Sequence, residues 1–221
     1  MNSVSLGSHT IELSNPDKVL FPGDGITKSD LVTYYREVAE TMLPHLRDRP
    51  LMLHRFPDGI GEGGFYQKQI GDYFPEWIDR IEVSKEGGST EHVVCNNAAT
   101  LVYLANQGCI SPHTWLSRVD QLQHPDELIF DLDPPGDDFE PVRFAARRLN
   151  ELLGEVELPS YVKTTGSRGL HVLVPLDRSA DFNAVRAFAR DVAALLAARE
   201  SKRLTTEQRK NKRQGRLYLD T

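Results

Sequence analysis

The chain has 221 residues, 39% of them hydrophobic, which is enough for a substantial core in one domain or two closely packed lobes. No apolar stretch approaches the roughly 20 residues that span a bilayer, and the N-terminus lacks a signal pattern, so a cytoplasmic protein with no membrane contact is expected. The formal net charge of −6 at pH 7 argues against a protein that coats duplex nucleic acid over its whole surface.

In the first half of the chain, Thr27 with Asp30 three residues later predicts a helix start, and Pro44 marks the expected helix end. Residues 51–56 are typical of a strand, and residues 59–64 of a glycine-rich turn. Further strands are expected at 81–83 and 92–95, followed by a helix at 97–107 that ends at Gly108.

In the second half, residues 139–153 and 182–196 show the spacing of amphipathic helices that pack on a sheet. Short strands are expected at 128–133, 161–164, 170–175 and 216–220. Helices and strands without strict alternation favour an α+β fold, with central antiparallel or mixed sheets flanked by helices. A weakly marked lobe boundary falls near residues 108–125, so an N-terminal lobe 1–110 and a catalytic lobe 111–221 are expected.

The most informative motif is Asp131-Leu132-Asp133, which follows the apolar run 128–130. Side chains two apart on a strand share a face, so these carboxylates lie roughly 6 to 7 Å apart along the backbone. Two divalent cations about 3.5 to 4 Å apart, held by such carboxylates, can serve phosphoryl transfer. An acidic surface turn leading into residues 134–138 would give the same pattern.

Three further features add to this motif. Asp220 ends the strand 216–220 and would supply a third carboxylate, although any strand can end in Asp. The stretch 164–171, Thr-Thr-Gly-Ser-Arg-Gly-Leu-His, offers hydroxyl, guanidinium, imidazole and backbone donors for a triphosphate, or it is a plain glycine turn. Residues 200–216 carry seven basic and two acidic residues, which favours anion binding over a solvated face.

Together, these motifs resemble those of the archaeo-eukaryotic primase superfamily. The segments 15–22 (NPDKVLFP), 26–28 (ITK), 64–68 (GFYQK) and 113–118 (HTWLSR) extend the resemblance to the polymerase domain of bacterial ligase D, an end-joining primase-polymerase. The resemblance covers the chain from about Ile11 to Asp220. It implies a primase-polymerase fold for residues 1–221. Relatives usually continue after the third Asp, so a C-terminal part of the family domain is expected to be absent.

The resemblance implies a role for each matching residue. Asp131, Asp133 and Asp220 are implied as catalytic ligands of two divalent metal ions, Mn²⁺ or Mg²⁺. The implied triphosphate-binding residues are Thr165, Ser167, Arg168, His171, Arg213 and Arg55.

For DNA, Lys18 and Lys28 match a pocket for the 5′-phosphate of a recessed end, although exposed lysines can simply aid solubility. Phe65 and Tyr66 match residues that stack on template bases, with core packing as the alternative. His113 would lie near the nucleotide or template, or be a buried structural histidine beside Trp115.

The function implied is a metal-dependent nucleotidyltransferase that extends primers and fills short gaps at DNA ends in non-homologous end joining, with a preference for ribonucleotides. Implied partners are 5′-phosphorylated DNA ends, nucleoside triphosphates, Ku and a DNA ligase, in a bacterial or archaeal cytoplasm, at the nucleoid when DNA is bound. A two-metal phosphoesterase and a non-catalytic DNA-end binding module remain open alternatives. The two cysteines, Cys95 and Cys109, form no metal motif and are expected to be buried thiols.

Overall fold

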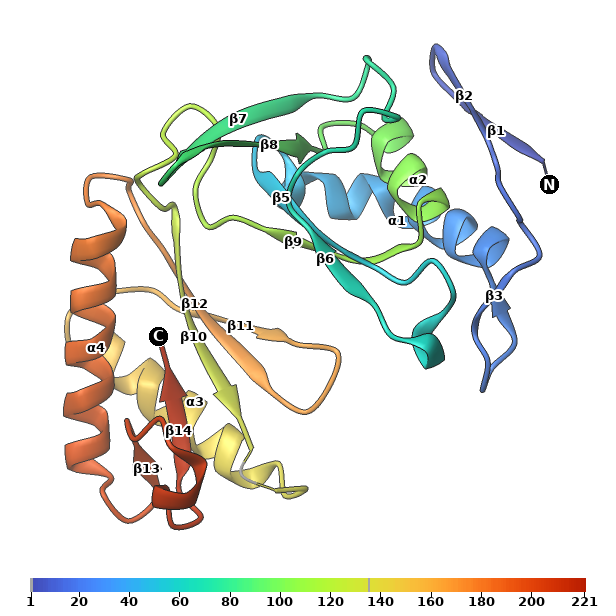
Figure 1. Cartoon of the computed structure of the whole chain (residues 1–221). Coiled ribbons are helices and arrows are strands. Elements are labelled where there is room, and N and C mark those ends of the chain that lie inside the picture. Colours follow the sequence, from blue (N-terminus) through green and yellow to red (C-terminus); the bar gives the residue numbers. More distant parts are fainter. Residues whose placement is uncertain (1, 135) are drawn as a thin grey trace. The chain divides into compact units, whose positions relative to one another are not determined.

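The computed structural model describes residues 2–134 and 136–221, so Pro135 of the turn after the paired aspartates lies outside the described residues. The chain divides into two compact units, one up to Asp120 and one from Gln121 to Thr221. Both units contain helices and sheets, antiparallel in the first unit and mixed in the second, which confirms the α+β fold class (Figure 1). In the described part of the chain, no helix has the length and apolar character needed to cross a membrane.

The first unit is built on one main sheet with the strand order β6-β5-β8-β7, and β9 also pairs with β5. Two small hairpins, β1 with β2 and β3 with β4, precede it. The bounds are β1 (Ser3–Leu6), β2 (His9–Glu12), β3 (Val19–Phe21), β4 (Ile26–Thr27), β5 (Pro50–Arg55), η1 (Ile60–Glu62), β6 (Phe65–Gln67), β7 (Arg80–Lys85), β8 (Gly88–Val94) and β9 (Cys109–Thr114).

Two helices pack on this sheet, α1 (Lys28–Leu46) and α2 (Ala98–Asn106). Thr27 caps α1, and its side chain and that of Asp30 form the expected capping box. The helix continues two residues beyond Pro44, so the expected end at that proline was wrong. Gly108, which has a φ of +71°, follows α2 as expected.

The core of the first unit lies between the helices and one face of the sheet. Leu51, Leu53 and Val93 point to this face and are buried. Cys95 and Cys109 are buried free thiols as expected, and burial raises the pKa of each to about 12. The alternation along β5 leaves Met52 and His54 on the opposite face, which carries no helix.

The second unit has a five-stranded sheet in the order β11-β12-β10-β14-β13. All neighbouring strands are antiparallel except β13 and β14, which are parallel. The bounds are β10 (Glu127–Asp133), α3 (Glu140–Gly154), β11 (Tyr161–Thr164), β12 (Leu170–Pro175), α4 (Phe182–Arg199), β13 (Leu204–Thr205), η2 (Lys210–Lys212) and β14 (Leu217–Asp220).

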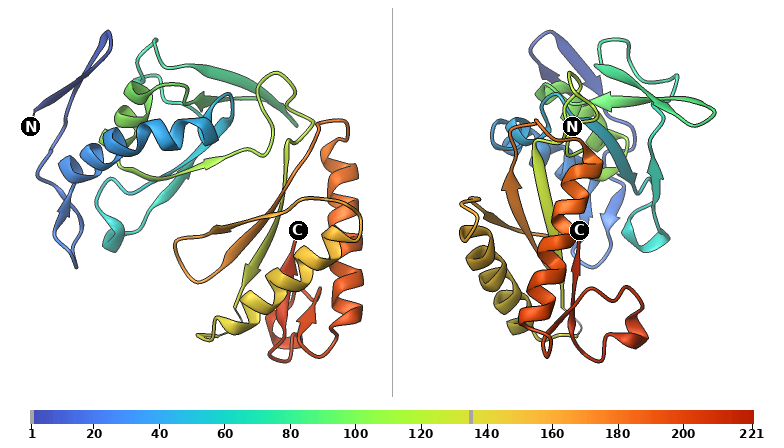
Figure 2. Two further views of the ribbon diagram at one scale, coloured as in Figure 1. Left: turned by 180° about the vertical axis from the view of Figure 1, so that it is seen from behind. Right: turned by 90° about the vertical axis from the view of Figure 1, so that its left-hand side faces the viewer.

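Both α3 and α4 cover the same face of this sheet (Figure 2). Leu128, Phe130 and Leu132 of β10 are fully or almost fully buried against them. The alternate residues Ile129, Asp131 and Asp133 must therefore point to the face that the helices leave open.

Candidate active site

The central residues of the site form a row across neighbouring strands on the open face of the second unit's sheet. Asp131 of β10 lies directly opposite His171 of β12 on one side and Asp220 of β14 on the other. Asp133 lies opposite Tyr218. The strand register therefore brings together the three aspartates that the sequence analysis singled out, although Asp220 is distant in sequence.

The pKa of Asp131 is shifted by its surroundings. Burial raises the pKa of Asp131 above its usual value, and the charges of Asp133 and Asp220 raise it further, while His171 opposes the shift. The Nε2 of His171 lies 3.6 Å from the Oδ1 of Asp131. Burial lowers the pKa of His171, so the imidazole has a reduced tendency to carry a compensating charge.

These carboxylates suit a divalent cation. The Oδ1 of Asp131 is buried and has no hydrogen-bond partner in the structure, which is a costly arrangement for an oxygen that nothing coordinates. Carboxylate oxygens are hard ligands that Mg²⁺ and Mn²⁺ prefer. Within residues 2–134 and 136–221, no three His, Cys, Asp or Glu side chains already have metal-ligand geometry, so the carboxylates would have to turn toward a common point.

The glycine turn between β11 and β12 closes over the end of β10. Gly166 has a φ of +78°, and the Oγ1 of Thr165 accepts a hydrogen bond from the backbone N–H of Gly169 at 3.2 Å. A Cβ at Gly169 would lie only 2.7 Å from the Oδ1 of Asp133. The turn therefore needs glycine at this position so that the Asp133 carboxylate can lie against the backbone.

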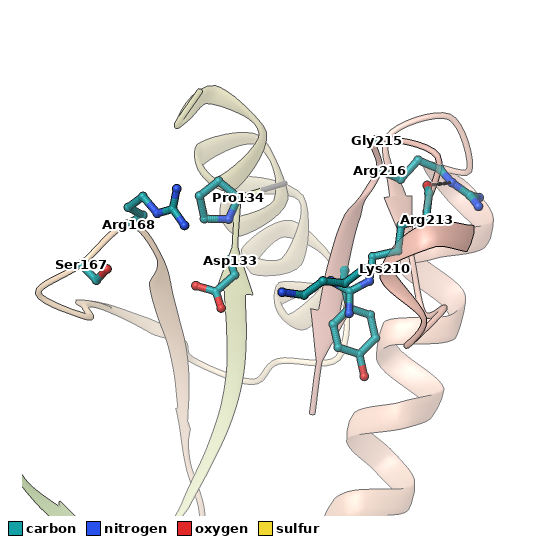
Figure 3. Close-up of a pocket in the computed structure, with 9 residues that line it drawn as sticks. Asp133, Pro134, Ser167, Arg168, Lys210, Arg213, Gly215 and Arg216 are labelled. Carbon is teal, nitrogen blue, oxygen red and sulfur yellow. Dashed lines mark hydrogen bonds between the residues drawn. The ribbon is translucent and has the colours of Figure 1, made fainter. Parts of the chain in front are cut away.

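A pocket of about 420 Å³ opens beside Asp133 (Figure 3). Ser167 and Arg168 reach it from the glycine turn, and the opposite wall comes from the segment around η2 and β14. The residues lining it are Asp133, Pro134, Ser167, Arg168, Lys210, Arg213, Gly215, Arg216 and Tyr218. Four basic side chains against one carboxylate make this pocket suited to a polyanion.

Arg213 is held rigidly at this pocket. Its guanidinium donates to the carbonyl oxygens of Glu207 at 3.0 Å and Gln208 at 2.8 Å, and it lies 4.2 Å from the centre of the Tyr218 ring. Arg168, in contrast, is exposed and pairs with Asp137 at 3.1 Å. Thr165 and His171 do not line the pocket, because Thr165 organises the turn and His171 faces Asp131.

In the first unit, two predicted phosphate-binding lysines lie near each other in sequence, Lys28 as the first residue of α1 and Lys18 in the loop before β3. Lys28 is buried, and its Nζ donates to the carbonyl oxygen of Ser14 at 2.7 Å. Burial lowers the pKa of Lys28, and the charges of Lys18 and Arg55 lower it further. Lys18 is half-buried and pairs with Asp58 at 2.5 Å. The alternative of an exposed lysine that aids solubility was therefore wrong for Lys28, which packing against Ser14 removes from solvent.

Arg55 lies in the first unit and uses all three guanidinium nitrogens. Its Nη1 donates to the side chains of Gln67 and Tyr73, both at 2.6 Å, its Nε to the backbone oxygen of Gln107 at 2.8 Å, and its Nη2 to the Oε1 of Gln107 at 3.2 Å. The charge of Arg55 also contributes to lowering the pKa of Lys28, in the same unit.

The family description "LigD, primase-polymerase domain" matches residues 27–221. The chain belongs to the LigD primase-polymerase family. The expected resemblance, the primase-polymerase fold and the class of DNA-directed nucleotidyltransferase are thereby confirmed.

Comparison with individual LigD proteins also places the chain in this family. The chain is 32% identical to the multifunctional non-homologous end joining protein LigD of Mycolicibacterium smegmatis, over 95% of this chain and 28% of that protein. It is 32% identical to the bifunctional LigD protein of Bacillus subtilis, over 95% of this chain and 34% of that protein. The solved polymerase domain of Mycobacterium tuberculosis ligase D in complex with DNA matches with a TM-score of 0.89 and 31% identity, over 95% of this chain and 76% of that one. The chain thus spans about a third or less of these curated relatives.

The two aromatic residues expected to stack on bases in this LigD-family domain are both exposed, Phe65 by 48% and Tyr66 by 57%, so the core-packing alternative was wrong. They point to opposite faces of the sheet, as adjacent residues of a strand must. Phe65 pairs with Arg55, whose guanidinium lies 5.5 Å from the ring centre. Tyr66 stacks on His54 at 4.1 Å.

His113 is exposed, so the alternative of a buried structural histidine was wrong for this residue. Its ring lies 5.6 Å from that of Tyr66. The buried histidine beside Trp115 is His92, which was not singled out; its ring meets the indole edge to face at 5.5 Å.

Several residues of the LigD-family site were missed individually. Lys210, Arg216 and Tyr218 line the pocket with Asp133, and His54 underlies Tyr66. The excess of basic residues in 200–216 indicated an anion site, but it did not distinguish the arginines that face the pocket from those that face solvent. No sequence signal marked His54.

Proposed function

We propose that this domain extends primers and fills short gaps at DNA ends in non-homologous end joining. The observation that carries the proposal is the strand register that places Asp131 beside Asp220, with Asp133 at the mouth of a basic pocket. Its relatives are bacterial end-joining proteins, so we place its action on chromosomal DNA ends in the bacterial cytoplasm. We further propose that residues 1–221 act as one domain, in which the second unit carries the chemistry.

In this proposal, Asp131, Asp133 and Asp220 hold two divalent ions, Mn²⁺ in preference to Mg²⁺. Such ions, when bound, activate an attacking 3′-oxygen and neutralise the charge of the leaving pyrophosphate. Ser167, Arg168 and Arg213 bind the triphosphate, with Thr165 shaping the turn that presents Ser167. His171 faces Asp131 and supports its orientation.

Lys18 and Lys28, with Arg55 nearby, bind the 5′-phosphate of the downstream DNA strand. A partly buried lysine interacts more strongly with an anion than a fully solvated lysine does, because the local dielectric constant is lower. Phe65 and Tyr66 contact template bases, and His113 lies beside Tyr66 on the same surface. Ribonucleoside triphosphates are the preferred substrates, and Ku and a DNA ligase are the partners in end joining.

Primer extension on a labelled, gapped duplex with a downstream 5′-phosphate tests the proposal. The wild-type chain should lengthen the primer with Mn²⁺ and ribonucleotides, whereas Asp131→Asn and Asp133→Asn should each lose at least about 1,000-fold in rate, since they remove the groups that position the ions. Full activity of both variants would contradict this mechanism. Shortening of the primer without nucleotide would favour the phosphoesterase, and tight end binding with no incorporation under any metal would favour the end-binding module.

A further inference from the structure

Asn106, the last residue of α2, is a buried polar residue to which the proposed function gives no role. It is 4% exposed, and both ends of its amide are paired with backbone atoms that are distant in sequence. Its Oδ1 accepts a hydrogen bond from the backbone N–H of Ser14 at 3.0 Å, and its Nδ2 donates to the carbonyl oxygen of Glu12 at 3.0 Å. Because one partner can only donate and the other can only accept, the orientation of the amide is fixed. The end of α2 is therefore joined to the segment that follows β2.

Ser14 in turn contacts the ammonium group of Lys28. The Nζ of Lys28 donates to the carbonyl oxygen of Ser14 at 2.7 Å and to its hydroxyl oxygen at 3.2 Å. The hydroxyl of Ser14 donates to the Oδ1 of Asn106 at 3.4 Å. An ammonium group has three N–H donors, so these two contacts leave one donor for a ligand. The three residues thus form a chain of hydrogen bonds from the end of α2 to the start of α1.

The charge of Lys28 is not balanced by a carboxylate. In the part of the chain that the structure describes, Lys28 forms no ion pair, and both of its side-chain hydrogen bonds go to neutral groups of Ser14. Burial lowers the pKa of Lys28, and the charges of Lys18 and Arg55 lower it further. An anion beside the amine would favour its charged form. The fold therefore holds a cation at this point and leaves the counter-charge to a ligand.

Two backbone hydrogen bonds join the loop before β3 to the start of α1. The N–H of Lys28 donates to the carbonyl oxygen of Lys18 at 2.8 Å, and the N–H of Ser29 donates to that of Pro16 at 2.9 Å. These bonds satisfy N–H groups that the first turn of a helix leaves without a partner. They fix the two backbone segments but do not reach the ammonium of Lys28. The direction of that side chain depends on Ser14 and on the α2 residue that holds it.

We propose that Asn106 is a positioning residue for the 5′-phosphate of the downstream strand, because it holds Ser14 where Ser14 orients the ammonium of Lys28. A lysine has a long, flexible side chain, and fixing it before the ligand arrives removes an entropic cost from binding. Asn106 acts only through Lys28 and does not contact the phosphate. This inference rests on the proposed function, which assigns the phosphate to Lys28.

Binding of a labelled gapped duplex, measured by fluorescence anisotropy without nucleotide or divalent metal, tests this role. The measured quantity is the ratio of the Kd for a gap with a 5′-hydroxyl to the Kd for a gap with a 5′-phosphate. Wild type should prefer the phosphate, and Asn106→Ala should lower the ratio by about 10-fold, the effect of losing a hydrogen bond that serves a charged group. Ser14→Ala should lower it less, because the backbone of Ser14 keeps its bonds to Lys28 and Asn106. The Kd for the 5′-hydroxyl duplex should change little in either variant.

Asn96→Ala is the matched control. Asn96 also lies in the first unit and also joins distant segments, since its Oδ1 accepts from the backbone N–H of Asp48 at 2.8 Å and its Nδ2 donates to the carboxylate of Asp79 at 3.2 Å. Asn96→Ala and Asn106→Ala should both lower the Tm, because each leaves a backbone N–H without its acceptor. Only Asn106→Ala should lower the ratio. Equal losses of the ratio in the two variants would show that general destabilisation is the cause and would overturn the inference.

A second substitution covers the case in which Asn106→Ala does not fold. Asn106→Asp keeps the acceptor for the N–H of Ser14. The Oδ1 of Asn106 and the Nζ of Lys28 contact the same hydroxyl, so this substitution places a carboxylate within two hydrogen bonds of the ammonium. The added charge should compensate that of Lys28 and lower the ratio by at least about 10-fold. In a Lys28→Met background neither substitution should lower the ratio further, because the group through which Asn106 acts is missing.

The outcomes separate this inference from the proposed function. A ratio that Lys28→Met abolishes and both Asn106 variants retain would overturn the role of Asn106 and leave the phosphate site intact. A further fall when Asn106→Ala is added to Lys28→Met would show that Asn106 acts through another group, which would also overturn the inference. A wild type that binds both duplexes equally would contradict the 5′-phosphate site itself, and with it the role of Asn106.

Discussion

The Oδ1 of Asp133 lies so close to the Cα of Gly169 that a Cβ on that residue would be 2.7 Å from the oxygen. The same Cβ would lie 2.9 Å from the backbone oxygen of Leu132. The glycine turn that lines the basic pocket is therefore in close contact with the carboxylate at the end of β10.

Gly169→Ala should displace the Asp133 carboxylate or the turn by a few tenths of an ångström or more. Misplacing a catalytic group by about 1 Å can cost on the order of 100-fold in rate, so a loss of about 10- to 100-fold in kcat for primer extension is expected. Gly154→Ala is the matched control, because a Cβ there meets nothing within 4 Å. Equal kcat values for the two variants would show that Asp133 has no role that depends on its position.

Asp131→Asn should stabilise the metal-free protein at neutral pH. Burial, followed by the charge of Asp133, raises the pKa of Asp131, so the folded state binds its proton more readily than the unfolded state does. The stabilising contribution of such a group is complete below the unfolded pKa near 3.9 and is lost as pH rises through the folded pKa. Because the side chain is 43% exposed and partly screened, the expected gain in Tm at pH 7 is only about 1 to 3 °C.

Thermal unfolding at pH 7 and pH 3 without divalent metal measures this effect, and the gain should disappear at pH 3. Millimolar Mn²⁺ should raise the Tm of wild type and not that of Asp131→Asn. Asp177→Asn is a control for which the expected change in Tm at pH 7 has the opposite sign. Hydrogen bonds from Ser179 lower the pKa of Asp177, so the stabilising contribution of this carboxylate is present above the unfolded pKa and lost in acid. An Asp131→Asn variant that is less stable at pH 7 than wild type would contradict the repulsion between these carboxylates.

Lys28→Met should remove the advantage of a 5′-phosphorylated downstream strand. A charge-assisted hydrogen bond contributes about 1.5 to 3 kcal/mol, so the ratio of kcat/KM on 5′-phosphate to that on 5′-hydroxyl gapped DNA should fall by roughly 10- to 100-fold. Lys28→Arg should keep most of the preference, and Arg36→Met, on the exposed side of α1, should keep all of it. A preference that survives Lys28→Met would assign the phosphate to another site.

Arg213→Ala should raise the KM for the nucleoside triphosphate by at least about 10-fold, because Glu207 and Gln208 hold the guanidinium at the pocket proposed for the triphosphate. The KM for DNA should change much less. Steady-state kinetics with nucleotide as the varied substrate measures this. Arg199→Ala, which breaks an exposed ion pair with Glu155, is the control and should leave both constants unchanged. An unchanged KM for the nucleotide in Arg213→Ala would show that this arginine does not bind the triphosphate.

The sequence by itself determined the local elements that depend on short-range chemistry. The capping pair of Thr27 and Asp30 started α1 at the expected residue, and the spacing of apolar residues located α3 and α4, because caps and amphipathic faces are decided within a few residues. The motif set also identified the family. Alternation along β10 was enough to place Asp131 and Asp133 on one face.

Only the tertiary structure decided which distant residues meet. Strand register brought Asp220 opposite Asp131, and packing of the start of α1 against Ser14 buried Lys28, whereas in sequence Asp220 and Lys28 are ordinary polar residues. The stacking of Tyr66 on His54 likewise depends on the pairing of β5 with β6. Register and burial arise from packing between segments far apart in the chain, and no local pattern of residues encodes a contact of that kind.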